Sequence, residues 1–132
     1  MNYCLDSDTL IYFLNGRQGV AARFEGVSTA HLHISVVSVA EVLTGFEKAP
    51  GQTIAEQRFQ ELLAAVTVLP FELEDARVAA KIRAILEQAG FKIGPYDLQI
   101  AGQALRRGLT LVTHNVRHFK RVPGLAVEDW SA

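Results

Sequence analysis

The chain has 132 residues, of which 49% are hydrophobic and 20% charged, and its formal net charge is −1. That length is sufficient for a hydrophobic core, so we expect one domain spanning residues 1–132. The single cysteine, Cys4, excludes an internal disulfide, and no apolar run is long enough to cross a membrane. The first residues lack the features of a secretory signal, so we expect a cytoplasmic protein.

The first half of the chain alternates between apolar or β-branched runs and helical patterns. Two strands are predicted, over residues 2–5 and 31–37. Helices are predicted over residues 9–14, 20–27, 38–48 and 54–65. Asp8 is expected to cap the first of these helices and Ser38 the third, because short polar side chains satisfy the free N–H groups of a helix start.

The second half continues the same alternation. Three further strands are predicted, over residues 66–70, 109–113 and 125–128, and two long helices over residues 72–89 and 95–107. Strands separated by helices favour a parallel sheet with helices on both faces. The sequence therefore predicts a three-layer α/β sandwich with a central parallel sheet of about five strands. In such sheets ligands bind at the carboxyl ends of the strands.

Three acids lie where an apolar run gives way to a helix: Asp6, Glu41 and Asp97. A carboxylate beside buried apolar chain is costly unless it is paired, hydrogen-bonded or neutralised by a cation. Each acid also has a purely structural explanation. Asp6 or Asp8 caps a helix, the pattern from Ser38 to Glu41 matches a capping box, and Asp97 lies in a first helical turn, where negative charge is favourable. These explanations do not account for three acids at equivalent places, so we expect them to share one cation.

A second polar group, Thr113-His114-Asn115, follows the fourth predicted strand. Hydroxyl and amide groups at a strand end are suited to orienting a water or a phosphate. The spacing of His114 and His118 gives little support for zinc, because Asn115 and Val116 are typical of a turn. An all-oxygen site favours Mg²⁺ or Mn²⁺.

Charge is distributed unevenly along the chain. Residues 1–75 carry four Lys/Arg against ten Asp/Glu, whereas residues 76–132 carry nine against four. A basic second half could bind a phosphate backbone, or it could be a set of solvated helix faces. The candidates for contacting a nucleic acid are Lys81, Arg83, Lys92, Arg106, Arg107, Arg117, Lys120 and Arg121.

Together these motifs resemble a PIN-domain ribonuclease, and more narrowly a VapC-type toxin of bacterial type II toxin–antitoxin pairs. The resemblance spans essentially the whole chain. It rests on Leu5-Asp6-Ser7-Asp8-Thr9, Ser38-Val39-Ala40-Glu41, Gly94-Pro95-Tyr96-Asp97, Thr113-His114-Asn115 and the ending Glu128-Asp129-Trp130.

The resemblance implies a PIN-like fold and a Mg²⁺- or Mn²⁺-dependent endoribonuclease, with transfer RNA as one candidate substrate. It assigns Asp6, Glu41 and Asp97 as metal ligands and adds Thr113 and Asn115 to the catalytic set. Many PIN domains carry a fourth acid where this chain has Asn115. The family also implies a homodimer and a VapB-type antitoxin, for which the apolar helices over 9–14 and 20–27 offer a surface.

Two alternative functions remain. The spacing Asp6-Ser7-Asp8-Thr9 is similar to that of haloacid-dehalogenase-like phosphatases, in which the first acid is a nucleophile. That family's downstream lysine and paired acids have no convincing counterpart here. The other alternative is a catalytically inactive RNA-binding domain, which the presence of all three acids disfavours.

Overall fold

The computed structural model describes residues 1–131. Its strands are β1 (Tyr3–Leu5), β2 (Leu32–Ser35), β3 (Thr67–Leu69), β4 (Thr110–Val112) and β5 (Val127–Glu128). Its α-helices are α1 (Ser7–Leu14), α2 (Gln18–Glu25), α3 (Val36–Lys48), α4 (Thr53–Ala65), α5 (Leu73–Gln88), α6 (Pro95–Arg106) and α7 (Val116–Phe119), and a 3₁₀ turn, η1, covers Thr29–His31. Within residues 1–131 no helix combines the length and apolar character needed to span a bilayer.

The five strands form one parallel sheet in the order β3-β2-β1-β4-β5. β1 is central, with Tyr3 paired to Leu32 of β2 on one side and to Thr110 of β4 on the other. The chain therefore builds the sheet outward from β1 in one direction and then returns to continue on its other side. This reversal of strand order leaves a crevice at the carboxyl ends of β1 and β4. The predicted parallel sheet of about five strands is confirmed.

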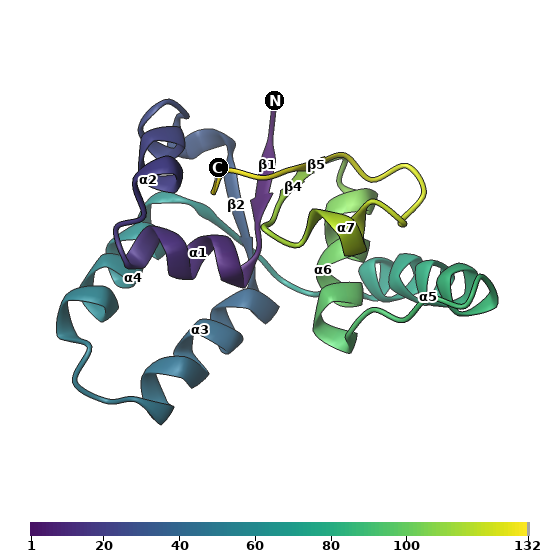
Figure 1. The fold of residues 1–132 in the computed structure, drawn as a ribbon, viewed down its shortest axis with the longest axis horizontal. Helices are drawn as coiled ribbons and strands as arrows, with labels where there is room; N and C mark the ends of the chain where they lie inside the picture. The colour runs from purple at the N-terminus through teal and green to yellow at the C-terminus, as the bar shows by residue number, and fades with distance from the viewer. Residues whose placement is uncertain (132) are drawn as a thin grey trace.

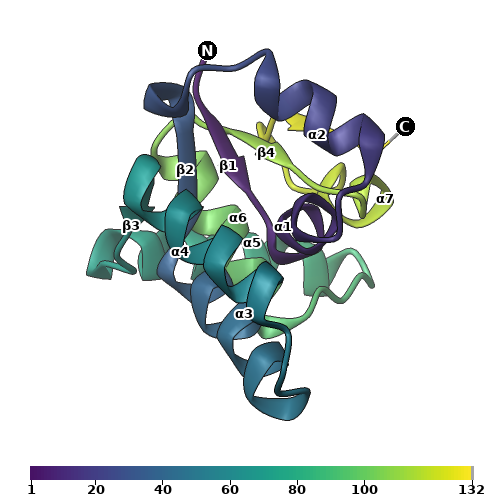
Figure 2. The ribbon, with the colours of Figure 1, turned by 90° about the vertical axis from the view of Figure 1, so that its left-hand side faces the viewer.

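Helices cover both faces of the sheet, as predicted (Figure 1). Successive strand residues point to opposite faces, so Cys4 and Leu111 pack toward α5, α6 and α7, while Leu5 and Val112 pack toward α1–α4. Figure 2 shows the α1–α4 side turned toward the viewer, with β1 and β2 behind it. The central strands β1 and β4 are largely buried on both faces, whereas Thr67 and Val68 of the edge strand β3 are exposed.

Two helix caps differ from the sequence prediction. Helix α3 begins at Val36 rather than at Ser38, because Ser35 is the cap and its Oγ accepts from the N–H of Val37 at 3.0 Å. The preceding strand is correspondingly shorter than predicted. Helix α1 begins at Ser7, and its cap is Asp6 rather than Asp8. In each case the cap is the polar residue next to the strand end, where the backbone turns.

Helices α5 and α6 pack closely against each other. A Cβ atom on Gly102 of α6 would lie 2.9 Å from both the Cβ of Ala79 and the carbonyl oxygen of Asp75. Glu72 and Asp75 cap α5 reciprocally, and the fully buried Asp75 carboxylate accepts from Arg106 at 2.6 Å and from Arg107 at 3.2 Å. Burial alone would raise the pKa of Asp75, but these hydrogen bonds lower it overall. The network fixes α6, and α6 carries Asp97.

Candidate active site

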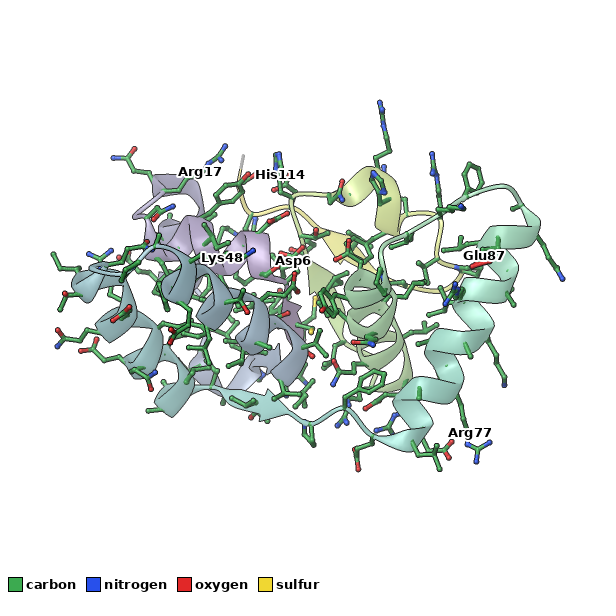
Figure 3. All side chains as sticks on the ribbon, turned by 90° about the horizontal axis from the view of Figure 1, so that it is seen from below. Asp6, Arg17, Lys48, Arg77, Glu87 and His114 are labelled. Atoms are coloured by element: carbon green, nitrogen blue, oxygen red, sulfur yellow. The ribbon has the colours of Figure 1, made fainter. Side chains whose placement is uncertain are left out.

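The candidate site lies at the carboxyl ends of the two central strands. Asp6 follows β1 directly, and its backbone N–H donates to the carbonyl oxygen of Val112, the last residue of β4, at 3.1 Å. Thr113 follows Val112, so Asp6 and Thr113 are brought together at adjacent strand ends. Figure 3 places Asp6 near the middle of the molecule, between α1 and α6.

Asp6 is buried and serves as a helix cap. Its Oδ1 accepts from the backbone N–H of Thr9 at 3.0 Å, while the Thr9 hydroxyl donates to the carbonyl oxygen of Val112 at 3.1 Å. Burial raises the pKa of Asp6 to about 6, an effect that hydrogen bonds from Thr113 and Thr9 partly offset and that the charge of Asp8 reinforces. A buried carboxylate with a raised pKa favours a nearby cation.

Glu41 lies on the second turn of α3 and is half-buried. Burial is the largest cause that raises the pKa of Glu41, and the negative charge of Asp97 is the next. The charges of Asp6 and Asp8 raise it by smaller amounts. Its Oε1 is buried and has no hydrogen-bond partner among the described residues, and the same is true of the hydroxyl of Ser38 one turn earlier. The capping-box explanation of Glu41 is therefore wrong, since Ser35 caps the helix.

Asp97 lies in the first turn of α6, which begins at Pro95. Burial raises its pKa, as does the negative charge of Asp8, whereas His118 of α7 acts in the opposite direction. Asp8 is exposed on α1 and adds a fourth negative charge to the group. From the sequence, Asp8 was expected to cap the helix, and its place among the other acids was not predicted. The signal available in the sequence was the position of Asp6 next to the strand end, which makes Asp6 the better cap.

The acids lower one another's tendency to ionise, which means that they share one region of negative potential. No three Asp, Glu, His or Cys residues within 1–131 are arranged to hold an ion with their side chains as they stand. The donor chemistry nevertheless suits a hard divalent cation, because all the candidate ligands are carboxylates and the buried Oε1 of Glu41 lacks a partner. Rotation of exposed or half-buried side chains would be needed to complete such a site.

Thr113 and Asn115 occupy the turn between β4 and α7. Thr113 is fully buried, and its Oγ1 accepts from the backbone N–H of Asn115 at 2.9 Å. The side chain of Asn115 makes no cap hydrogen bond to α7, although Asn115 is the residue at the cap position. The Asn115 amide therefore has no role in holding this helix start.

The basic candidates fall into two groups. Arg106 and Arg107 are paired with Glu72 and Asp75, and Arg83 is paired with Glu87 at 2.6 Å. These arginines have structural partners. The others are exposed and form no ion pair within residues 1–131; they are Lys81, Lys92, Arg117, Lys120 and Arg121.

The family model of the PIN domain matches residues 3–125. Among curated proteins, the chain is 35% identical to a tRNA(fMet)-specific endonuclease VapC of Salmonella typhimurium over 98% of each chain. It is 33% identical to a ribonuclease VapC2 of Haemophilus influenzae, again over 98% of each.

Two solved structures with the same fold contain toxin–antitoxin pairs. One is DNA-bound VapBC from Salmonella typhimurium, which has a TM-score of 0.89 and 32% identity over 98% of both chains. The other is VapBC2 from Rickettsia felis bound to a promoter DNA fragment, with a TM-score of 0.88 and 28% identity over 98% of this chain and 99% of that one.

The chain combines a parallel sheet of this strand order, acids at the switch point of the sheet and a match to the PIN-domain model. These features place it in the class of PIN-domain nucleases. Within that class, the chain belongs to the VapC ribonucleases of the PIN-domain family. The family membership predicted from the motifs is confirmed. It sets aside the phosphatase alternative, whose nucleophile would have been Asp6.

Proposed function

We propose that this chain is a Mg²⁺-dependent endoribonuclease that acts as the toxin of a toxin–antitoxin pair. The observation that carries the proposal is the gathering of Asp6, Glu41 and Asp97 at the switch point of the sheet, each with a raised pKa. A cation that offsets the charge of such a cluster would stabilise it at neutral pH. The names of the relatives support RNA as the substrate class.

In this proposal, Asp6, Glu41 and Asp97 hold the Mg²⁺, with Mn²⁺ as a substitute. When bound, the cation lowers the pKa of a water and offsets negative charge on the RNA phosphate. Asp6 is fixed for this role, since its Oδ1 caps α1 and its position at the end of β1 is set by the sheet. Thr113 and Asn115 orient the water or the phosphate from the neighbouring strand end.

The proposal assigns one tightly bound cation to the free protein. Asn115 is neutral, so the β4 strand end contributes no carboxylate. Asp8 contributes charge but is exposed, and an exposed carboxylate holds an ion weakly because water competes for both partners. A second cation would then bind mainly together with the RNA phosphate.

The partner in this proposal is a VapB-type antitoxin. A hollow of about 150 Å³ between α1, α3 and α4 supports it, because Ile11, Val42 and Phe46 line the hollow and Glu41 lies at its edge. An apolar side chain of an antitoxin helix would fit there, and a basic side chain on the same helix would compete with the cation for the acids. We also propose a homodimer, and transfer RNA as the first substrate to test, following the name of the Salmonella relative.

The test is cleavage by the purified chain of total RNA and of isolated transfer RNA, with Mg²⁺, Mn²⁺ or EDTA. We expect cleavage with either metal and none with EDTA, and we expect Asp97→Asn to be inactive. A chain that binds RNA without cutting it under any of these conditions would support the inactive RNA-binding alternative. Cleavage that persists in EDTA would contradict the metal-dependent mechanism.

A further inference from the structure

A hollow of about 410 Å³ lies between the end of α5 and the start of α6. Its apolar wall is made by Leu86, Ile93 and Leu98, all of which are at least nine-tenths buried. Pro95 also lines it, and Pro95 opens the helical turn that carries Asp97. The hollow therefore adjoins the first turn of α6, the helix that also carries Asp97.

An aromatic ring and a guanidinium are stacked at this hollow. The Cζ of Arg121 lies 3.9 Å from the centroid of the Phe91 ring, and Phe91 lines the hollow while remaining 37% exposed. Arg121 has no carboxylate partner within residues 1–131, so only the ring holds its guanidinium. A guanidinium plane supported on one face by an aromatic ring offers its other face for stacking.

The surroundings of the hollow are cationic. Lys92 lines it, and Lys120 and Arg117 lie on or next to α7, the helix whose His118 acts electrostatically on Asp97. None of these three cations has an ion-pair partner among the described residues, whereas Arg83 at the same hollow is neutralised by Glu87. Lys92 is therefore an unpaired cation at the hollow itself, and two more lie on or next to α7.

We propose that this hollow binds one nucleobase of the RNA substrate, with the base packed against the Phe91 ring and the Arg121 guanidinium that lies over it, and with its phosphates tracked by Lys92. The inference rests on the proposed ribonuclease function and adds a subsite to it. A flat heteroaromatic group joined to phosphates matches an apolar wall with a cationic edge, since bases stack on aromatic and guanidinium planes while Lys and Arg contact the backbone.

The test uses a 5′-labelled single-stranded RNA oligonucleotide and a matched oligonucleotide with abasic residues, both in EDTA to prevent cleavage. Arg121→Lys keeps the charge but loses the planar stacking surface, and Phe91→Ala removes the ring behind it. We expect each to weaken RNA binding by about tenfold in fluorescence anisotropy. Neither should change the affinity for the abasic probe by a comparable factor.

Matched controls come from α5. Arg77→Lys changes an exposed arginine that is paired with Glu74, and Ile85→Ala removes an exposed apolar side chain outside the hollow. Both should bind like the wild-type chain. Lys92→Gln should weaken binding to both probes and reduce the salt dependence of binding, because it removes a phosphate contact.

The outcomes separate this subsite from the proposed function. Equal weakening on both probes, or no weakening at all, would overturn the base subsite even if the wild-type chain cleaves RNA. A wild-type chain that cleaves no RNA would instead refute the proposed function. If Phe91→Ala fails to fold, Phe91→Trp decides the question. Its fluorescence should be quenched by the RNA and not by the abasic probe, and the absence of that difference would overturn the proposal.

Discussion

Asp6 combines two roles in a single carboxylate. Its Oδ1 caps α1 through the N–H of Thr9, and its position between the central strands places the same group among the other acids. From the sequence, two different residues were expected to fill these roles, Asp8 as the helix cap and Asp6 as a metal ligand. The structure shows that one buried acid has both a capping position and a raised pKa.

The raised pKa predicts a pH-dependent effect of Asp6→Asn. Between pH 3.8 and about 6, folded Asp6 keeps a proton that the unfolded chain has released, so the wild-type chain loses stability as pH rises through this window. Asn also caps helices and does not titrate. In EDTA and above pH 6, we expect the free energy of unfolding of the variant to exceed that of the wild-type chain by up to about 3 kcal/mol. Near pH 4 we expect no difference.

Thermal unfolding at pH 4 and pH 7.5 measures this difference. Adding Mg²⁺ at pH 7.5 should narrow it, because the wild-type chain would gain the binding energy of the cation and the variant would not. A variant that is less stable than wild type at pH 7.5 in EDTA would contradict the assigned pKa.

Substitution of Glu41 distinguishes a catalytic role of this residue from a structural one. Because Ser35 caps α3, Glu41→Gln should leave folding intact. The substitution also removes a negative charge that the neighbouring acids repel. We expect an unchanged or higher melting temperature and a loss of cleavage of about two orders of magnitude or more, since even indirect metal contacts contribute about 10–100-fold. Adding Asp97→Asn should cost little further, because the acids act as a unit.

The measurement is the initial rate of RNA cleavage together with the melting temperature. Glu47→Gln is the matched control, since Glu47 is an exposed acid on the same helix. That control should keep wild-type activity. Full activity in Glu41→Gln would remove Glu41 from the proposed set of ligands.

At the scale of elements, helix starts were the least predictable feature. The β-branched residues Val36 and Val37 follow Ser35 directly, so the sequence pattern extended the strand beyond its actual end at Ser35. Parallel pairing decides this point, since Ser35 is the last β2 residue with a partner on β3. Because α3 begins two residues earlier than predicted, Glu41 lies on the second turn of the helix. It is therefore near the other acids rather than at its own helix end.

Close packing of α5 against α6 predicts that Gly102→Ala is destabilising. The added methyl group would lie 2.9 Å from a backbone oxygen and from the Cβ of Ala79, so the two helices would have to separate. We expect a loss of about 1–3 kcal/mol in the free energy of unfolding, measured by denaturant titration. Reduced cleavage should accompany it, because Asp97 depends on the position of α6.

Gly45→Ala is the matched control. Gly45 lies inside α3, and a Cβ atom there would have no neighbour within 4 Å. Alanine should therefore stabilise the chain by about 0.5–1 kcal/mol through its higher helix propensity. Equal effects of the two substitutions would show that the contact at Gly102 is not tight.

At the scale of the whole molecule, an active ribonuclease needs a partner that holds it in check. Expression of the wild-type chain alone should arrest growth, and co-expression with the adjacent small open reading frame should restore it. Ile11→Gln places a polar amide in the apolar hollow between α1, α3 and α4 and should weaken that rescue, because an antitoxin helix would have to bury the amide. Growth assays and co-purification measure both effects.

Cleavage by purified Ile11→Gln provides the control, since Ile11 is 43% exposed and the substitution adds no charge beside Glu41, which lines the same hollow. It should cut RNA at the wild-type rate. A wild-type chain that is harmless when expressed alone but cuts RNA readily in vitro would indicate a housekeeping nuclease instead of a toxin.

The sequence by itself determined the class of fold, the parallel sheet, the order of the elements and the residues of the candidate site. These follow from local information, namely the apolar periodicity, the Gly and Pro stops and the acids placed after apolar runs. The same information also named Arg106 and Arg107 as RNA-contacting candidates. It could not reveal that both are held by Asp75, which lies more than 30 residues away along the chain.

Tertiary structure alone decided which strands are neighbours, which side chain caps each helix, and that Asp8 shares the potential of the other acids. It also brought Phe91 against Arg121 and formed the hollow between α5 and α6. These features depend on contacts between residues distant in sequence. A residue pattern encodes which face of an element is buried, but the partner that covers that face is chosen by packing of the whole chain.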